Sequence, residues 1–294
     1  MRISVPAVFL LSLSLLASSC VTIPETPYVV SRRGGAEDVA REALCRDDEA
    51  ESPVLPGEER REGIDPDGFT LFNWNVMKEG REGWREDFRR LAAEADLLTL
   101  QEASLTEGLR RELEEGRYHW DLTAAFLYNN RETGVLTGSR TAPASLCLTR
   151  FSEPLAVIPK TVLVSRYPLA GRDRFLLVAN VHLINFTVDT KRYREQLQEL
   201  EKILASHEGP LLLTGDFNTW SARRMGVVDG LIGRLGLSGV ELAEEDLASF
   251  NGRPVDHVYY RGLETADARV LKVSTSDHNP VMVRFSVPFR TGAK

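Results

Sequence analysis

The sequence predicts an α/β protein of the α+β type, in which two sheets pack together and helices cover their outer faces. Two observations favour this fold. Short apolar runs typical of buried strands occur in clusters as well as between helices, which argues against a strictly alternating parallel sheet. Other segments repeat apolar residues at helical spacing and would supply the outer layers. The 294-residue chain is 43% hydrophobic and 27% charged, so it can bury a sizeable core.

The predicted elements follow one another closely from residue 69 onward. Helical spacing is present at 84–95 and is clearest at 189–207, where an Asp or a Thr can cap the first turn and leucines line one face. A third helical pattern covers 221–236. The runs that predict strands are 69–76, 96–102, 134–139, 160–165, 174–183, 210–215, 255–260, 269–274 and 281–287.

Residues 1–19 have the features of a signal peptide. Arg2 is followed by an uncharged apolar stretch at 5–16 and then by small residues up to Cys20. The apolar stretch is too short for a membrane span and lies at the very start of the chain. We therefore expect an exported protein.

The sequence around Cys20 predicts a lipid anchor. "LASSC" is similar to a bacterial lipobox, in which the cysteine becomes the lipidated first residue of the mature chain. Ala17 stands where a leucine is commoner, so a simple signal peptide or an uncleaved anchor stays open. Val21 after the cysteine favours the outer membrane. We expect a lipid-anchored protein of the cell envelope, in the outer membrane or periplasm if the host is Gram-negative, with the membrane as a partner.

The remainder of the chain divides into three parts. Residues 20–67 are rich in acids, Gly and Pro and predict an acidic flexible tether, with a short helix at 36–44. Residues 68–288 form the expected folded domain, and 289–294 a C-terminal tail. The domain is expected to be a monomer.

Two cysteines, Cys45 and Cys147, remain after export into an oxidising compartment. A bridge between them would close a loop of about 100 residues and add about 4 kcal/mol in the chain-entropy account. The alternative is two unrelated thiols, with Cys147 buried in a strand. The sequence contains no CxxC or HExxH motif and gives no support for zinc.

The charge balance bears on possible partners. The whole chain has a net charge of −7, and no long run of Lys or Arg is present. Removal of residues 1–19 removes the cation Arg2 and leaves 35 basic against 43 acidic residues, a net charge of −8. A broad basic surface for nucleic acid is therefore excluded, whereas a local cationic groove is not.

Polar residues at the ends of predicted strands are the candidate site. They are Asn75, Glu102, His182, Asp216, Asn218, Asp256, Asp277 and His278. Taken singly, each has an ordinary structural explanation, such as a turn residue or a core histidine. Together they offer hard oxygen ligands that suit Mg²⁺, Mn²⁺ or Ca²⁺, beside two histidines that can act as base and acid. This set predicts hydrolysis of a phosphate ester.

The same residues carry a family resemblance. "WNV", "TLQE", "GVLTGSR", "NVHL", "GDFN", "DHVYY" and "SDHNP" occur in this order over about residues 69–285, which resembles the endonuclease/exonuclease/phosphatase superfamily. The resemblance implies a four-layer α/β/β/α sandwich with two packed mixed sheets, deoxyribonuclease-like, and a site at one edge of the paired sheets. "GDFNTWS" and "DHVYYRGL" look similar to a bacterial exported or membrane-linked branch.

The resemblance also implies a metal site. Asn75 and Glu102 match the metal-binding residues of the superfamily, with Glu102 as the principal ligand. Asp277 resembles the second acidic group near the metal. Mg²⁺ or Mn²⁺ is the implied cofactor.

The remaining roles are implied in the same way. His278 resembles the general base that activates water, and Asp256 the acid that orients it. His182 resembles the histidine that steadies the phosphate or protonates the leaving group. Asp216 and Asn218 match the pair that contacts water and phosphate, and a contact of this pair with a second metal stays open.

Four cations stay outside the predicted catalytic set. Lys78 and Arg140 are either phosphate contacts or surface cations. Arg223 and Arg224 follow "GDFNTWS" and are expected to be exposed.

The sequence therefore predicts a metal-dependent phosphoesterase that most simply hydrolyses a phosphodiester by in-line attack of a histidine-activated water. Nucleic acid, phospholipid and small phosphodiesters all stay open as substrates, although the charge balance does not indicate nucleic acid. The alternative is a non-catalytic binding lipoprotein that reuses the fold.

Overall fold

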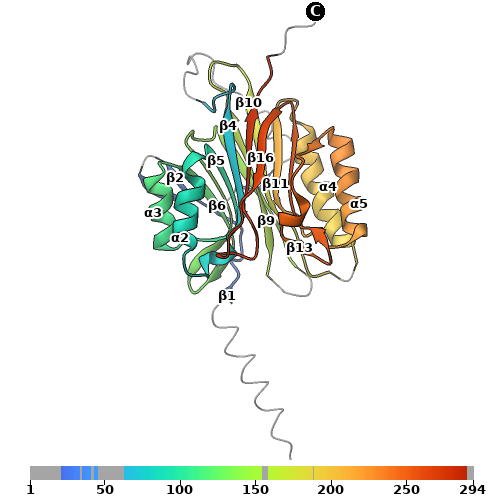
Figure 1. Cartoon of the computed structure of the whole chain (residues 1–294). Helices are drawn as coiled ribbons and strands as arrows, with labels where there is room; N and C mark the ends of the chain where they lie inside the picture. Colours follow the sequence, from blue (N-terminus) through green and yellow to red (C-terminus); the bar gives the residue numbers. More distant parts are fainter. Residues whose placement is uncertain are drawn as a thin grey trace, which may run out of the picture.

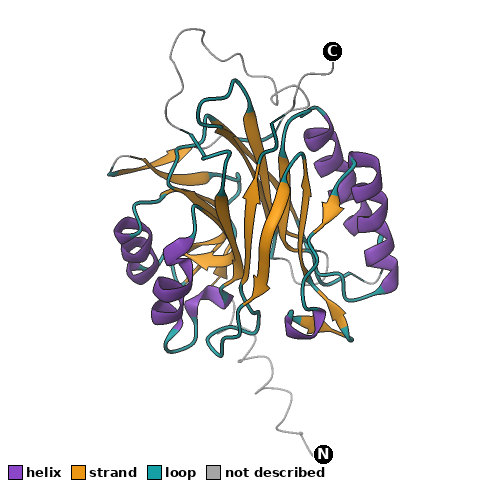
Figure 2. Cartoon of the chain, turned by 45° about the horizontal axis from the view of Figure 1, so that its top comes forward, coloured by secondary structure: helices purple, strands orange, loops and turns teal. Residues whose placement is uncertain are grey.

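The computed structural model describes residues 21–33, 35–40, 43–45, 63–153, 158–187 and 189–289. Two sheets pack against each other through an apolar layer, and helices cover their outer faces (Figure 1; Figure 2). This arrangement confirms the predicted α/β fold with two packed mixed sheets. None of the described helices is long and apolar enough to cross a membrane.

The larger sheet has nine strands. Its order is β16 (Glu264–Val270), β17 (Val281–Ser286), β4 (Phe69–Asn75), β5 (Leu97–Ser104), β7 (Arg131–Ser139), β6 (His119–Tyr128), β2 (Val29–Arg33) and β3 (Ala36–Ala40), with β1 (Val21–Thr22) beside β6. The central pair, β4 and β5, is parallel, and its outer neighbours β17 and β7 are antiparallel to it.

The smaller sheet has six strands. Its order is β12 (Ser238–Gly239), β15 (Asp256–Arg261), β11 (Leu211–Asp216), β10 (Phe175–His182), β9 (Lys160–Pro168) and β8 (Ser145–Phe151). The central pair, β10 and β11, is again parallel. A separate hairpin joins β13 (Ser249–Phe250) and β14 (Arg253–Pro254). The central strands are apolar along most of their length because both of their faces are covered.

Two helices cover each outer face. α2 (Trp84–Leu91) and α3 (Glu107–Glu115) lie on the larger sheet, and α4 (Lys191–Ala205) and α5 (Ala222–Leu235) on the smaller sheet (Figure 1). A 3₁₀ turn, η3 (Ala92–Glu94), completes the segment predicted as the first helix. α3 was not predicted, because only Leu109 and Leu113 form its apolar face.

The N-terminal segment corrects the prediction of a tether over 20–67. β2 and β3 form an antiparallel hairpin, and β2 pairs with β6, so the described residues 21–33 and 35–40 extend the larger sheet. The helix expected at 36–44 is wrong, since Ala36–Ala40 is strand β3. The pairing overrides the weak helical pattern because Val29 and Val30 are buried against the domain. Cys20 and residues 46–62 lie outside the described residues.

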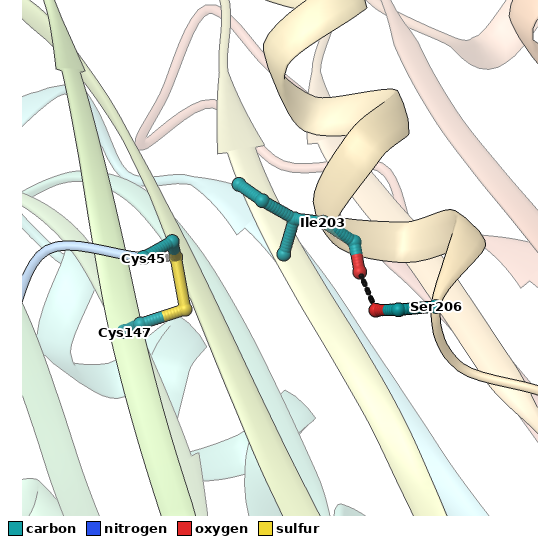
Figure 3. The surroundings of a disulfide bond; sticks show 4 residues. All are labelled: Cys45, Cys147, Ile203 and Ser206. Carbon is teal, nitrogen blue, oxygen red and sulfur yellow. Dashed lines mark hydrogen bonds between the residues drawn. A yellow bond between two sulfur atoms is a disulfide. The ribbon is translucent and has the colours of Figure 1, made fainter. Parts of the chain in front are cut away.

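A disulfide fixes the end of this segment. Cys45 and Cys147 are bonded, which confirms the predicted pairing, and their Cα atoms lie 4.7 Å apart. The bond joins the N-terminal segment to β8 beside Ile203 of α4 (Figure 3). With a sequence separation of 102 residues, the crosslink is expected to stabilise the fold by about 4 kcal/mol, mainly by restricting the unfolded chain.

Candidate active site

The candidate residues meet at one end of the two sheets. Asn75 ends β4, His182 ends β10 and Asp216 ends β11, while Asp256 begins the antiparallel strand β15. Glu102 lies near the end of β5, in an irregularity of its pairing with β7. Because parallel strands end at the same edge of a sheet, the two central pairs deliver these side chains to one place.

Asp216 is the centre of the first group. Its Oδ2 accepts a hydrogen bond from Asn75 Nδ2 at 3.1 Å and lies 3.4 Å from His182 Nε2. Glu102 Oε1 lies 4.0 Å from the same His182 nitrogen. Residues predicted from four strands therefore meet across the two sheets.

His278 and Asp256 form the second group. His278 Nδ1 lies 2.7 Å from Asp256 Oδ2. Since a carboxylate only accepts, Nδ1 carries the proton of this hydrogen bond. Nε2 takes no part in it. Burial lowers the pKa of His278, but the negative charges of Asp256, Asp216 and Asp277 outweigh it and raise the pKa to about 10. The ring thus lies in a strongly negative field.

The main chain around His278 is also fixed. Trp74 Nε1 donates to the His278 carbonyl at 2.9 Å, and Ser276 Oγ accepts from His278 N at 3.1 Å. Ser276 Oγ also donates to the Asn75 carbonyl at 2.7 Å, which ties the loop before β17 to the end of β4. Asp277 lies in this loop, is exposed and lines a cavity beside His278.

The donor set fits a hard divalent cation. Asp216, Asp256 and His278 offer ligand atoms that all lie within 4.8 Å of one another. Asp256 Oδ1 is buried and has no hydrogen-bond partner, so a lone pair is left for a cation. Two of these three residues are carboxylates, and the predicted ligands Asn75, Glu102 and Asp277 offer only carboxylate and amide oxygens. Mg²⁺ and Mn²⁺ prefer such oxygen ligands.

Glu102 is held in an unusual conformation. Its φ is +51°, in the left-handed region, which turns its side chain away from the regular alternation of the strand. Ser104 N donates to Glu79 Oε1 at 3.0 Å and secures the end of β5. Burial raises the pKa of Glu102, but the charges of His182, Lys160 and Lys78 outweigh it and lower the pKa to about 2.

Two lysines complete this side of the site. Lys78, a weak candidate from the sequence, forms an ion pair with Glu102. Lys160, which the sequence reasoning missed, lies with Nζ 2.7 Å from His182 Nε2. An ammonium group only donates, so the neutral imidazole accepts at Nε2 and holds its proton on Nδ1. Burial and the charge of Lys160 lower the pKa of His182 to about 4. The position of Lys160 at the start of a predicted strand was the available signal.

The loop after β11 is shaped by its backbone. Gly215 has a φ of +139°, and a Cβ at this position would lie 2.0 Å from the Val181 carbonyl oxygen. Asn218, with a φ of +52°, donates from its backbone N to Asp216 Oδ1 at 3.0 Å and from Nδ2 to the Leu183 carbonyl at 3.0 Å. These bonds hold the Asp216 and Asn218 side chains together at the site.

Arg224 is buried, so the prediction that it is exposed is wrong. Arg223 is exposed, as predicted. Ser221 caps α5 and turns Arg224 inward. Its guanidinium is buried over the rings of Tyr193 and Trp220. It donates to the carbonyls of Ile184, Asn185 and Asn218 and to Thr187 Oγ1, at 2.6, 2.6, 3.2 and 2.7 Å. Arg224 therefore joins the loop after β10 to the loop after β11. Arg140 bonds the carbonyls of Ala93 and Ala95 away from the site.

Two cavities flank the candidate residues. One of about 550 Å³ is lined by Asn218, Asp277 and His278 together with Trp220 and Phe250. The other, of about 200 Å³, is lined by Lys78, Glu102, Lys160 and His182. Phe186 lines both. The first cavity is partly aromatic and the second has a cationic side.

The chain matches the Endonuclease/Exonuclease/phosphatase family over residues 72–278. It belongs to this family. Membership supports a phosphoesterase of the hydrolase class. The motifs named above lie within or next to the matched region.

Relatives of the chain extend over nearly its whole length. It is 32% identical over 289 residues to a UPF0294 protein of Vibrio campbellii, covering 97% of this chain and 98% of that protein. An endonuclease/exonuclease/phosphatase family protein from Leptotrichia buccalis has a TM-score of 0.59 at 15% identity, with 74% of this chain and 99% of that chain covered. The human Nocturnin catalytic domain with bound sulfate has a TM-score of 0.57 at 19% identity, covering 78% and 98%. These two structures share the family fold.

Proposed function

We propose that this protein is a Mg²⁺- or Mn²⁺-dependent phosphodiesterase that hydrolyses its substrate by in-line attack of water. The observation that supports it most is the His278–Asp256 pair, at 2.7 Å, beside the cluster centred on Asp216. A histidine that lines a cavity and has one ring nitrogen fixed by a carboxylate has the geometry of a general base.

The metal ligands that we propose are the ones that the family resemblance implies, Asn75, Glu102 and Asp277. His278 and Asp256 of the acidic cluster are reserved for the base. When bound, a divalent ion would neutralise charge on the phosphate. It would also offset the negative charges that raise the pKa of His278 to about 10, so that Nε2 is free to accept a proton. Glu102 is suited to this because its low pKa keeps the carboxylate ionised. Lys78 holds one oxygen of that carboxylate, which fixes its orientation.

His278 takes the proton of the attacking water on Nε2 as the bond from water oxygen to phosphorus forms. Asp256 stabilises the resulting imidazolium through Nδ1. Asp216 and Asn218 orient the water and the phosphate oxygens. The bond from phosphorus to the leaving oxygen breaks on the side of His182 and Lys160, where the ammonium can donate a hydrogen bond or a proton.

The setting of the enzyme is part of the proposal. We infer an exported monomer, attached to the cell envelope through a lipid on Cys20, as in the bacterial branch that its motifs resemble. The apolar stretch and the cysteine before Val21 support this placement.

Turnover of bis-p-nitrophenyl phosphate by the purified full chain, with and without Mg²⁺ or Mn²⁺, tests the activity. His278→Ala is expected to lower kcat at least about 100-fold, in the range found for loss of a general base. His119→Ala is the matched control, because His119 is the first residue of β6 and lies at the end of that strand away from the site. Absence of turnover by the unaltered protein across a panel of phosphodiesters and both metals would contradict the proposal.

A further inference from the structure

Four of the seven large apolar side chains that are exposed in the described part of the chain belong to elements at the end of the fold that carries the site. Ile23, Tyr128, Phe186 and Phe250 are 38%, 38%, 56% and 61% exposed. They come from the segment after β1, the end of β6, the loop after β10 and strand β13. We call these four residues the apolar rim.

The elements that carry the four rim residues lie at one end of the molecule. Phe186 lines both cavities and Phe250 the larger one, so both border the site. Tyr128 pairs with Val21 of β1, two residues before Ile23. Figure 1 shows β1 and β13 toward the lower end of the molecule, opposite the end from which the chain leaves β17.

The described chain also begins at this end. Val21 and Thr22 pair with Tyr128 and Leu127, and Arg150 donates to the carbonyls of Pro24 and Glu25 at 2.7 and 2.9 Å. These contacts fix the segment that follows residue 20. The uncharged apolar residues 5–16 and the candidate lipid site Cys20 lie immediately before it in the sequence. An attachment at or before Cys20 therefore joins the domain at the rim.

We propose that the apolar rim rests on the surface of a lipid bilayer, with the opening of the site directed at the head groups. Aromatic side chains on a solvent-exposed edge are suited to the interfacial region of a bilayer. Taken with the proposed function, on which this second step rests, the contact makes phosphodiesters of lipid head groups the substrate class. The net charge of −7 and the absence of a long basic run disfavour nucleic acid as the occupant.

The contact is tested with the full chain in vesicles of phosphatidylethanolamine and phosphatidylglycerol that carry brominated acyl chains. The tryptophan emission added by Phe250→Trp is expected to be quenched at least about twice as strongly as that added by Phe289→Trp, because bromine quenches only within the bilayer. Phe289 is the matched control, since it is 78% exposed and follows β17 at the opposite end.

Equal quenching at both positions would overturn the contact. Quenching of Ile23→Trp without quenching of Phe250→Trp would also overturn it, because it would report the attachment alone.

Hydrogen exchange gives a second measurement of the contact. Amides of residues 248–252 are expected to slow on transfer of the full chain from detergent to nanodiscs of the same lipids. Protection of these amides by an oligonucleotide but not by lipid would favour a nucleic-acid surface instead.

The substrate class is tested by the double variant Ile23→Ser and Tyr128→Ser, whose altered side chains line neither cavity. Hydrolysis of vesicle lipids is expected to fall at least about tenfold, while turnover of soluble bis-p-nitrophenyl phosphate stays within about twofold. Turnover of the soluble ester by the unaltered protein without hydrolysis of vesicle lipids would overturn the substrate class and leave the proposed function standing. Absence of turnover on both would overturn the proposed function, while quenching still reports the contact.

Discussion

Lys160 Nζ lies 2.7 Å from His182 Nε2, so the first residue of β9 places a positive charge beside the imidazole of the last residue of β10. The two strands are antiparallel, which brings their opposite ends together. The cation beside the imidazole disfavours a second proton on the ring.

Lys160→Met is therefore expected to raise the pKa of His182 above about 4, because it removes a positive charge that opposes protonation. Burial of the imidazole, which lowers its pKa more than the charge of Lys160 does, remains. NMR titration of the metal-free protein measures the change directly. Lys202→Met on α4 serves as the control and should leave the His182 titration unaltered.

Arg224→Ala is expected to lower the free energy of unfolding by about 3 kcal/mol, since several charge-assisted hydrogen bonds to buried carbonyls are lost. Turnover should fall as well, because the two loops beside Asn218 are no longer joined. Urea denaturation measures the stability. The neighbouring exposed Arg223→Ala should change it by no more than about 0.5 kcal/mol. Equal effects of the two substitutions would contradict the structural role of Arg224.

Gly215→Ala is expected to destabilise the protein by more than about 2 kcal/mol, because the added Cβ meets the Val181 carbonyl and the backbone has a φ of +139°. Gly226→Ala in α5 is the counterpart. A Cβ there meets nothing within 4 Å, so a gain of about 0.5–1 kcal/mol from helix propensity is expected. Thermal denaturation of both variants tests the contrast.

The paired substitution Cys45→Ser and Cys147→Ser should lower stability by about 4 kcal/mol through release of the long closed loop. Reduction of the unaltered protein by dithiothreitol should give the same midpoint in urea. The double variant is the control for the reductant. A dithiothreitol effect that persists in it would show that the loss does not come from this bond.

Acid should weaken the fold through His257. Burial lowers its pKa from 6.5 to about 4, so the unfolded chain takes up a proton at a higher pH than the folded protein does. This contribution to stability is complete above pH 6.5 and is lost as the pH falls from there toward 4. Between these limits, the free energy of unfolding should fall by up to about 3 kcal/mol more than in His257→Gln. Parallel curves of stability against pH for the two proteins would exclude this histidine as the cause.

Much of the site could be predicted from the sequence because its residues follow apolar strands in recognisable motifs. Because each parallel pair ends at one edge of its sheet, four predicted residues lie within contact distance of one another: Asn75, Glu102, His182 and Asp216. Lys160 was not predicted, because a single lysine at the start of a strand belongs to no recognisable motif. Only the register of β9 against β10 brings it to His182.

The errors elsewhere have a similar origin. The weak helical spacing of 36–44 was overridden by pairing with β2, whose partner β6 lies about 90 residues later in the chain. Arg224 was expected in solvent because a charged residue near a helix start usually faces water. Its burial depends on carbonyl groups from two loops, which no local sequence pattern contains.

The strand order β16-β17-β4 also bears on how the molecule assembles. β4 is the first strand of the central parallel pair, and its antiparallel partner β17 is almost the last segment of the chain. Until β17 is present, β4 has an unpaired edge and His278, three residues before β17, has no fixed place. The candidate site can therefore form only after nearly the whole polypeptide has been synthesised. A C-terminally truncated chain is expected to lack the proposed activity and to be prone to aggregate.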